Sequence, residues 1–154
     1  MAHLLAPKPL DPELPVFFNV DGHVGPPPSA NASEDVLLVQ FCFQILARAS
    51  KINVSPELRA AAKAVPITGI IDPFTLNAIK EIQINIKKKS PGVTVDGIVS
   101  PAKGYLYSQG ALWTIVRLNN AVQEEYMNIW PRIDNIPACP LPLKAMVKRE
   151  VVGR

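Results

Sequence analysis

The chain has 154 residues, enough for one domain with additional terminal segments. Hydrophobic residues make up 48% and charged residues 19%, which supports a packed core and excludes a disordered chain. The net charge of +3 comes from scattered lysines and arginines, with one short run at residues 87–89, and this pattern argues against nucleic-acid binding.

No membrane segment or signal peptide is expected. No apolar run approaches the roughly 20 residues that cross a bilayer, and prolines interrupt the N-terminus early. We therefore expect a protein that stays in the cytoplasm or is exported as part of a phage-like or secretion assembly. The two isolated cysteines, Cys42 and Cys139, fit buried or free thiols rather than a disulfide framework.

Residues 1–30 are predicted to form a proline-rich N-terminal arm, and residues 130–154 a proline-containing tail. The arm holds seven of the 16 prolines and the tail four more. Because proline disfavours helix interiors and central strands, we expect both segments to be extended. Both carry apolar runs, which we expect to dock on their own domain or on a neighbouring chain.

The first helix is predicted over residues 33–49. Residues 31–34 have the pattern of a capping box, with Ser33 alone as the alternative cap. The run from Val36 to Leu46 is apolar nearly all round, and such a helix needs cover on most sides. A three-helix domain covers one side only, so we expect the arms or another chain to cover the rest. This feature favours an extended or oligomeric assembly.

Three further helices follow in the sequence pattern. Ser55 and Pro56 open a short helix that reaches about residue 64. The next spans 73–88, with an inner stripe of apolar residues, and leads to a short strand or turn at 93–95. The last is expected to start at Pro101, with a break near Gly104 or Gly110, and to end near residue 129 before a proline. The inner stripe consists of Ala78, Ile79, Ile82 and Ile86.

A turn pattern occurs twice, at residues 67–75 and 95–101. Each copy contains a polar residue, a glycine that permits positive φ, two branched apolar residues expected in the core, a capping residue and a proline. We expect Asp72 and Ser100 to cap the helices after these turns, because a side-chain oxygen can accept an amide of the first turn. The two caps are 28 residues apart (100 − 72), and we interpret the copies as an internal half-repeat. Residues 20–26 echo the turn faintly, which we interpret as fortuitous.

This order of elements resembles the peptidoglycan-binding-like domain, a three-helix module found on many cell-wall hydrolases. That family has a hydrophobic-Gln pair in its first helix, a Gly-hydrophobic-hydrophobic-Gly/Asp-Pro turn opening a helix that ends in Phe-Gln, and an Asp-Gly-Ile-Val-Gly-Pro turn before its last helix. Residues 38–40, 68–75 and 96–101 match these places, with Ile82-Gln83 for Phe-Gln. Ser100 replaces the usual Gly, and Trp113 lies well downstream of its usual place.

The resemblance covers roughly residues 33–125. It implies an all-α fold, a small three-helix bundle at residues 31–129 with extended arms on both sides. It also implies a shallow groove between the two turn–helix units that takes a sugar or a stem peptide. For Thr68, Asp72 and Asp96 the alternative is a local role in capping or bracing turns, and for Trp113 it is a core position. The predicted ligand-binding residues are Thr68, Asp72, Asp96, Lys103, Tyr105, Tyr107 and Trp113.

No signature of catalysis or metal binding is present. His3, His23 and the two cysteines do not have the spacing of a compact zinc motif. Cys42 lies in an apolar helix, where a thiolate is disfavoured. Residues 124–125 are adjacent glutamates expected on a solvated helix surface, not carboxylates facing each other across a cleft. We predict a protein that is not an enzyme and needs no cofactor.

Two functions remain open. The resemblance favours a noncatalytic peptidoglycan-binding protein, a targeting or anchoring subunit of a phage tail or tail-like injection machine. The physical pattern alone favours a structural protein that binds a protein partner, or itself, through the Val36 to Leu46 helix and the apolar arms. We take cell-wall binding as the prediction and assembly as the alternative.

Overall fold

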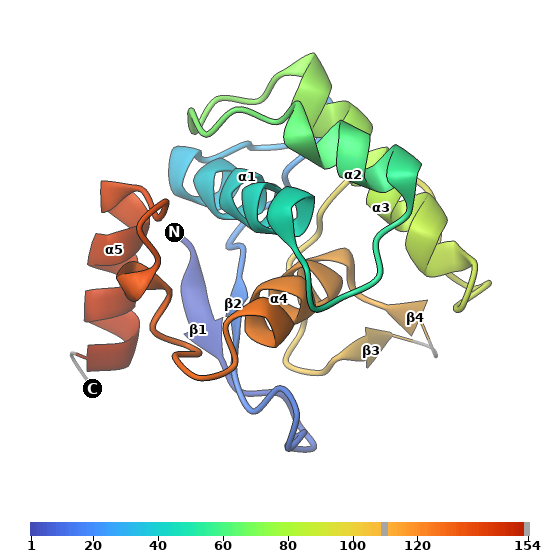
Figure 1. Ribbon diagram of the computed structural model, residues 1–154. Helices are drawn as coiled ribbons and strands as arrows, with labels where there is room; N and C mark the ends of the chain where they lie inside the picture. Colours follow the sequence, from blue (N-terminus) through green and yellow to red (C-terminus); the bar gives the residue numbers. More distant parts are fainter. Residues whose placement is uncertain (109–110, 153–154) are drawn as a thin grey trace.

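The computed structural model describes residues 1–108 and 111–152 (Figure 1). Within these residues the fold is mostly helical, with five α-helices and two small antiparallel sheets of two strands each. The prediction of a helical fold is confirmed, and the prediction of a pure three-helix bundle is wrong. The helices are α1 (Ser33–Arg48), α2 (Pro56–Lys63), α3 (Pro73–Lys87), α4 (Thr114–Glu125) and α5 (Leu141–Val147). The strands are β1 (His3–Leu5) with β2 (Phe17–Asn19), and β3 (Tyr107–Ser108) with β4 (Ala111–Leu112).

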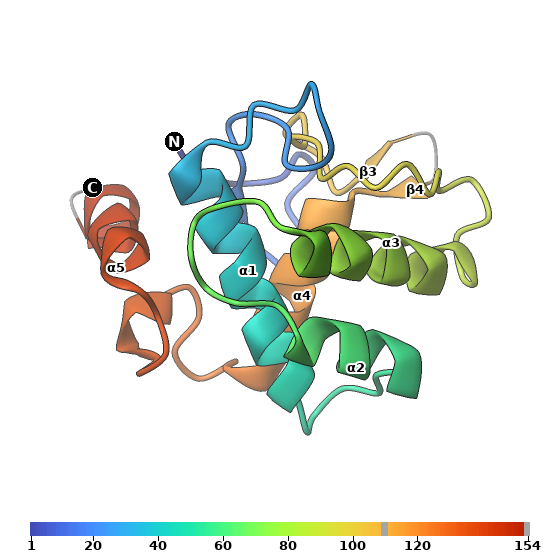
Figure 2. The ribbon, with the colours of Figure 1, turned by 90° about the horizontal axis from the view of Figure 1, so that it is seen from above.

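Helix α1 lies in the middle of the molecule, with α5 on one side and α2 and α3 on the other (Figure 2). Its residues from Asp35 to Phe43 are all buried. They share one hydrophobic core with Phe17 and Phe18 of β2 and with the buried residues of α5. The expectation that the arms cover this helix is confirmed, and they cover it within the same chain. Every residue of the run from Val36 to Leu46 except the half-buried Gln44 is thus buried within the chain.

The side chain of Asn119 joins the N-terminal arm to α4 by making the two backbone hydrogen bonds with Phe18 that a neighbouring strand would make. The Phe18 N–H donates to Asn119 Oδ1 at 2.7 Å, and Asn119 Nδ2 donates to the Phe18 carbonyl at 2.8 Å. The indole of Trp130 packs edge-on against Phe18 with ring centroids 5.5 Å apart, and its N–H donates to the Val16 carbonyl at 3.3 Å. The arm is thus part of the core.

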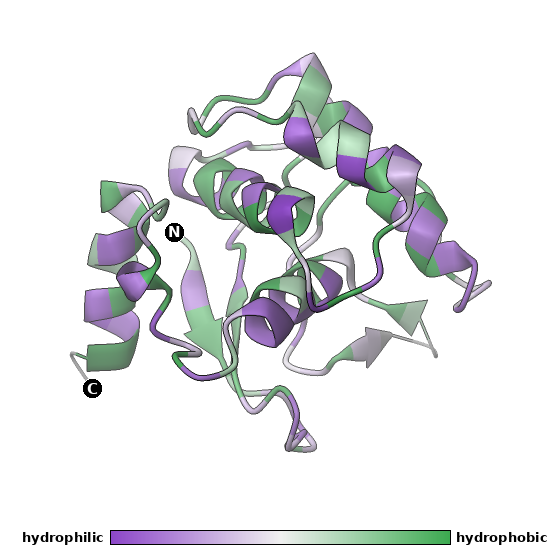
Figure 3. Ribbon diagram, in the orientation of Figure 1, coloured by the Kyte–Doolittle hydropathy of each residue, from purple (hydrophilic) through white to green (hydrophobic). Residues whose placement is uncertain are grey.

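The tail is helical, so the prediction of an extended tail is wrong. It forms a 3₁₀ turn (Ile133–Asn135), α5 and a π-helical turn (Lys148–Val152). Leu143, Met146 and Val147 have the i, i+3, i+4 spacing of a buried helix face, and all three are buried. Proline in the first turn of α5 does not oppose the helix. In Figure 3, α4 and α5 alternate between hydrophobic and hydrophilic segments, as helices that bury one side do.

Helices α2 and α3 begin and end within a residue of their predicted bounds. Ser55 accepts the Leu58 N–H at 3.3 Å as the predicted cap of α2, and the predicted stripe of α3 is buried. The predicted capping box of α1 is wrong, since Ala32 occupies the cap position without a side-chain bond. Asn31 instead ties its own loop, donating to the Gly25 carbonyl and accepting the Gly25 N–H, both at 2.9 Å. No helix among the described residues combines the length and hydropathy needed to span a bilayer.

Candidate functional site

Gln40, fully buried in α1, holds the first turn in place. Its Oε1 accepts the backbone N–H groups of Thr68 at 2.8 Å and Gly69 at 2.9 Å, which fixes the orientation of the amide. Its Nε2 has two protons and lies within 3.4 Å of four acceptors, so it serves the whole turn rather than one partner. These acceptors are Ile70 O, Thr75 Oγ1, Asp72 Oδ2 and Thr68 Oγ1.

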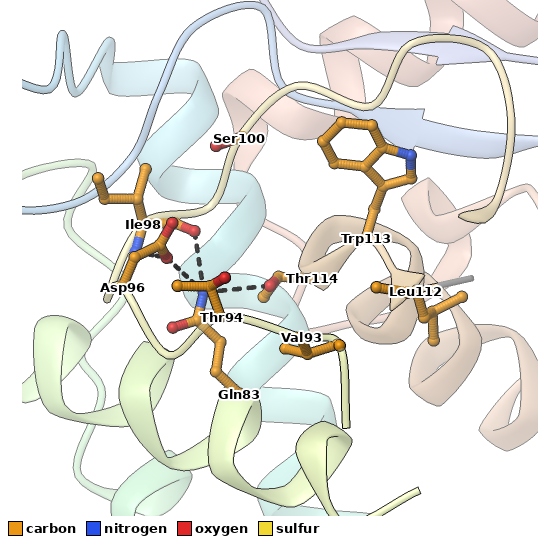
Figure 4. A pocket seen from close by; sticks show the side chains of 11 residues that line it. Gln83, Val93, Thr94, Asp96, Ile98, Ser100, Leu112, Trp113 and Thr114 are labelled. Atoms are coloured by element: carbon orange, nitrogen blue, oxygen red, sulfur yellow. Dashed lines mark hydrogen bonds between the residues drawn. The ribbon is translucent and has the colours of Figure 1, made fainter. Parts of the chain in front are cut away.

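Gln83 of α3 holds the second turn in the same way (Figure 4). Its Oε1 accepts the Gly97 N–H at 2.8 Å. Its Nε2 lies 3.0 Å from both Asp96 Oδ1 and the Ile98 carbonyl and 3.2 Å from Thr114 Oγ1. The half-repeat in the sequence thus corresponds to two glutamine clamps, one projecting from α1 and the other from α3.

The two turns lead to different structures. Asp72 caps α3 as predicted, with its Oδ1 accepting the Thr75 N–H at 2.7 Å. The predicted cap at Ser100 is wrong, because no helix starts at Pro101 and α4 begins at Thr114. Ser100 Oγ instead lies 3.1 Å from His23 Nδ1.

The N-terminal arm explains why no helix starts after the second turn. Asn19 accepts the Ala102 N–H at 3.0 Å and donates to the Ala102 carbonyl at 2.8 Å, as a neighbouring strand would. The Lys8 N–H donates to the Gly104 carbonyl at 2.7 Å, and Gly104 has φ of +88°. These contacts hold the chain in a non-helical conformation. The β3–β4 hairpin then separates the turn from α4.

The branched residues of the turns do not all enter the core as expected. Val99 is fully buried, Ile71 and Ile98 are half-buried, and Ile70 is 71% exposed. Successive residues of an extended chain point in opposite directions, so a turn of this shape buries one residue of each pair more than the other. Val99 is also paired through two backbone hydrogen bonds with Val24, at 2.8 and 3.0 Å.

The stretch at 20–26 has a structural role of its own, although its glycines lack the positive φ of Gly69 and Gly97. The buried carboxylate of Asp35 accepts the N–H groups of Asp21 at 3.1 Å and Gly22 at 3.0 Å. A Cβ at Gly25 would lie 2.9 Å from the Gly97 carbonyl oxygen, so only glycine permits this close approach to the second turn. As expected, no helix starts there.

A cavity of about 250 Å³ lies beside the second turn, between it and the β3–β4 hairpin (Figure 4). Its polar lining includes the Asp96 carboxylate and hydroxyl groups, and its apolar lining includes the indole of Trp113. Asp96 Oδ1 is used by the clamp, accepting the Gln83 amide and the Ile98 N–H, whereas Oδ2 makes no hydrogen bond with the residues that the structure describes. The hydroxyls belong to Thr94, Ser100 and Thr114.

The predicted site residues fall into three groups. Asp96 and Trp113 line the cavity, and Tyr105 lies against Trp113 with ring centroids 5.9 Å apart. Tyr107 lines a different cavity, and Lys103 is exposed. Two remaining residues, Thr68 and Asp72, lie in the first clamp.

Of the two turns, only the second contributes residues to the cavity of about 250 Å³. A groove between the turns, as expected from the sequence, would be lined by both. Thr68, Asp72 and Asp96 brace turns, which was the alternative interpretation for these three residues. Sequence reasoning missed the hydroxyl residues Thr94, Ser100 and Thr114 as a group. The one signal in the sequence was that Ser100 lies in the repeated turn and Thr114 follows Trp113.

The surroundings of both cysteines disfavour the thiolate. Burial raises the pKa of Cys42 to about 12, with a smaller contribution from the nearby Cys139. Burial also raises the pKa of Cys139 to about 12, so both thiols stay protonated at neutral pH. In the N-terminal arm, His3 Nδ1 lies 3.9 Å from Asp21 Oδ1. Across residues 1–108 and 111–152, no group of three or more His, Cys, Asp and Glu side chains is arranged to hold a metal ion.

The site is thus a small cavity with mixed polar and aromatic walls on a mostly helical domain. The chain matches no family model, no curated protein and no solved structure. The resemblance to the peptidoglycan-binding-like domain rests on its sequence motifs, and Gln40, Gln83, Gly69 and Gly97 of those motifs form the two clamps.

Proposed function

We propose that this protein is a noncatalytic peptidoglycan-binding protein and that the cavity beside the second turn takes a sugar or a stem peptide. The observation that supports this most is the lining of the cavity, in which a carboxylate and three hydroxyls face the same space as an indole. Polar groups that converge on one cavity can fix the orientation of a ligand there, and here they make up much of the lining. Hydroxyl and amide groups of the ligand would meet Asp96 Oδ2, and its apolar face would meet Trp113.

The size of the cavity limits what it can hold. Its volume of about 250 Å³ is below the roughly 300–1,000 Å³ of sites for drug-sized ligands. It suits one small unit of a polymer rather than a long stretch. Affinity for a wall would then come from many copies in an assembly, as in a phage tail or tail-like injection machine.

The same lining argues for binding without cleavage. Asp96 is the one carboxylate among the residues that line the cavity. Glycoside hydrolysis usually needs a pair of carboxyl groups about 5–10 Å apart, one of them acting as the acid. The role that fits is targeting or anchoring.

Protein assembly is the second candidate, and it now depends on a different surface. Ile70, three residues before α3, is 71% exposed, and Phe74, the second residue of α3, is 57% exposed. Exposed apolar side chains close together are a feature of interaction sites. If this surface mediates assembly, replacing both residues by serine will lower the mass measured by light scattering.

Co-sedimentation with purified peptidoglycan sacculi tests the first proposal. Thr94→Trp places a large side chain at the cavity while leaving the glutamine clamp intact, since Thr94 is exposed and lies on the lining. We expect retention to fall by about tenfold, because a filled cavity excludes the ligand. The full-length protein must be used, since both arms belong to the core.

Asn77→Trp is the matched control, because Asn77 is an exposed residue of α3 that does not line the cavity. It should be retained as well as the wild type. Equal retention of both tryptophan variants would contradict the assignment of the cavity. If the wild type were retained no better than an unrelated protein, the proposed function itself would be contradicted.

A further inference from the structure

A second and larger cavity, of about 560 Å³, lies next to the first, and Leu112 lines both. Its apolar lining includes Val54, Ile86 and Leu112, with the ring of Tyr107 beside them. A third cavity of about 400 Å³ continues it, because the two share Asn53, Lys89 and Arg117. We call these two joined cavities the basic groove.

The charge of the basic groove is strongly one-sided. Lys51, Lys88, Lys89 and Arg117 line it, against a single carboxylate, Glu124. The lysines at 88 and 89 follow the end of α3, where cations complement the helix dipole, so their presence has a structural reason. Arg117 has no such reason, because it is the fourth residue of α4.

Arg117 is a partly buried cation without a close partner. Its guanidinium makes neither a hydrogen bond nor an ion pair with any residue in the described part of the chain. Burial lowers the pKa of Arg117, and the charge of Glu124 opposes this only partly. Desolvating a charge is unfavourable unless a counter-charge is supplied. A bound anion would supply it.

We propose that the basic groove binds a ligand that carries an oxyanion, a carboxylate or a phosphate, on an apolar body. The guanidinium of Arg117 takes the oxyanion through two parallel N–H donors, which is the geometry that arginine favours. Lys88 and Lys89 add positive charge, and Leu112 with the Tyr107 ring contacts the apolar body. The volume of about 560 Å³ falls in the range of small-molecule sites. This site is separate from the peptidoglycan proposal and does not depend on it.

An NMR titration of the full-length, ¹⁵N-labelled protein in a phosphate-free buffer of low ionic strength tests the proposal. The probes are phenyl phosphate, benzoate, inorganic phosphate and benzyl alcohol. We expect saturable shifts for phenyl phosphate or benzoate at amides of residues 85–90, 112 and 117. Whichever of the two binds more tightly identifies the oxyanion. Inorganic phosphate, which lacks the body, and benzyl alcohol, which lacks the charge, should each bind at least about tenfold more weakly, since each loses one half of the contacts.

Arg117→Gln should weaken binding of the preferred probe by about tenfold, because the charged, two-pronged contact is lost. Lys63→Gln is the matched control, since Lys63 is exposed on α2 and does not line the groove. If Arg117→Gln does not fold, the double variant Lys88→Gln/Lys89→Gln at the exposed rim gives the same test.

Three results would overturn the proposal. They are wild-type affinity in the variants of the groove, shifts confined to residues outside it, and benzyl alcohol binding as tightly as the anions. Thr94→Trp separates this proposal from the previous one. It should leave the titration unchanged while reducing retention on sacculi, because Thr94 lines the other cavity only.

Discussion

The first and second turns are held by the same kind of clamp and lead to different structures. Each turn has a glycine with positive φ, +77° at Gly69 and +74° at Gly97, and each is held by a buried glutamine. A threonine hydroxyl from the following helix completes each clamp, Thr75 for the first and Thr114 for the second. In the first turn that threonine is three residues after the cap Asp72, whereas in the second the β3–β4 hairpin intervenes.

A clamp of this kind therefore does not require a helix to start directly after the turn. The clamp fixes the turn and the place of the threonine, and it occurs with two connections of different length between them. The longer connection at the second turn forms one wall of the candidate cavity, with Leu112 and Trp113 in its lining. The first turn has no such wall, because α3 begins at once. The candidate cavity thus lies where the repeat is interrupted.

The largest expected effect comes from removing each clamp. Gln40→Leu should lower the free energy of unfolding by about 3 kcal/mol and Gln83→Leu by about 2 kcal/mol, because buried N–H groups lose their acceptor. The first loss is larger since Gln40 accepts two backbone N–H groups and Gln83 one. Urea denaturation monitored by circular dichroism measures both.

Gln44→Leu is the control on the same helix. Gln44 is half-buried and donates one hydrogen bond, to the Val65 carbonyl at 2.8 Å. Its replacement should cost no more than about 1 kcal/mol. If Gln83→Leu lowered the free energy of unfolding as much as Gln40→Leu or more, the number of backbone N–H groups bound by each glutamine would not determine the size of the loss.

Replacing the turn glycines should cause the next largest loss of stability. Gly69→Ala and Gly97→Ala both place a side chain at positive φ, which costs about 1–2 kcal/mol. At Gly69 the new Cβ would also lie 2.7 Å from Ser33 Oγ and 3.2 Å from Leu37 Cγ, whereas at Gly97 its nearest neighbour is the flexible Lys80 chain at 3.2 Å. We expect Gly69→Ala to be the more destabilising by about 1 kcal/mol, because a packed core yields less than a surface lysine.

Gly104→Ala isolates the backbone contribution. Gly104 has φ of +88°, and a Cβ added there would have no described atom within 4 Å, so its replacement reports the conformational cost alone. Melting curves of the three variants should rank Gly69→Ala below Gly97→Ala, with Gly104→Ala close to the latter. The reverse order of the two turn glycines would mean that contacts at Ser33 relax freely.

The elements that were predictable from sequence are those whose signals are local. Ser55 with Pro56, and Asp72 with Pro73, carry cap and first-turn residue side by side, and both helices start there. The signal at Ser100 with Pro101 is equally good, and it failed because Asn19, 83 residues away from Ala102 in the sequence, holds Ala102 in an extended conformation. A contact of that range leaves no trace in the local pattern.

The candidate site was predictable in part for the same reason. Asp96 and Trp113 were found because a turn motif and an aromatic residue mark them, and both line the cavity. Thr94 and Thr114 join them only because the hairpin folds back beside the second turn. The tail helix was not predicted, because prolines argue against a helix more visibly than the short apolar stripe of α5 argues for one.

The smallest expected loss of stability is that of Ser100→Ala, and comparing it with Asp72→Ala distinguishes the two turns most clearly. Asp72→Ala should cost about 1–2 kcal/mol, because the first turn of α3 loses its cap. Ser100→Ala should cost less than about 0.5 kcal/mol, because Ser100 caps no helix and meets only His23 among the described residues. Ser55→Ala, which removes the cap of α2, provides a reference for an ordinary capping loss.

Ser100 lines the cavity, so its variant should lose sacculus binding while keeping its stability. A loss at Ser100 as large as that at Asp72 would contradict this contrast, because it would mean that Ser100 stabilises the second turn as strongly as a helix cap stabilises the first.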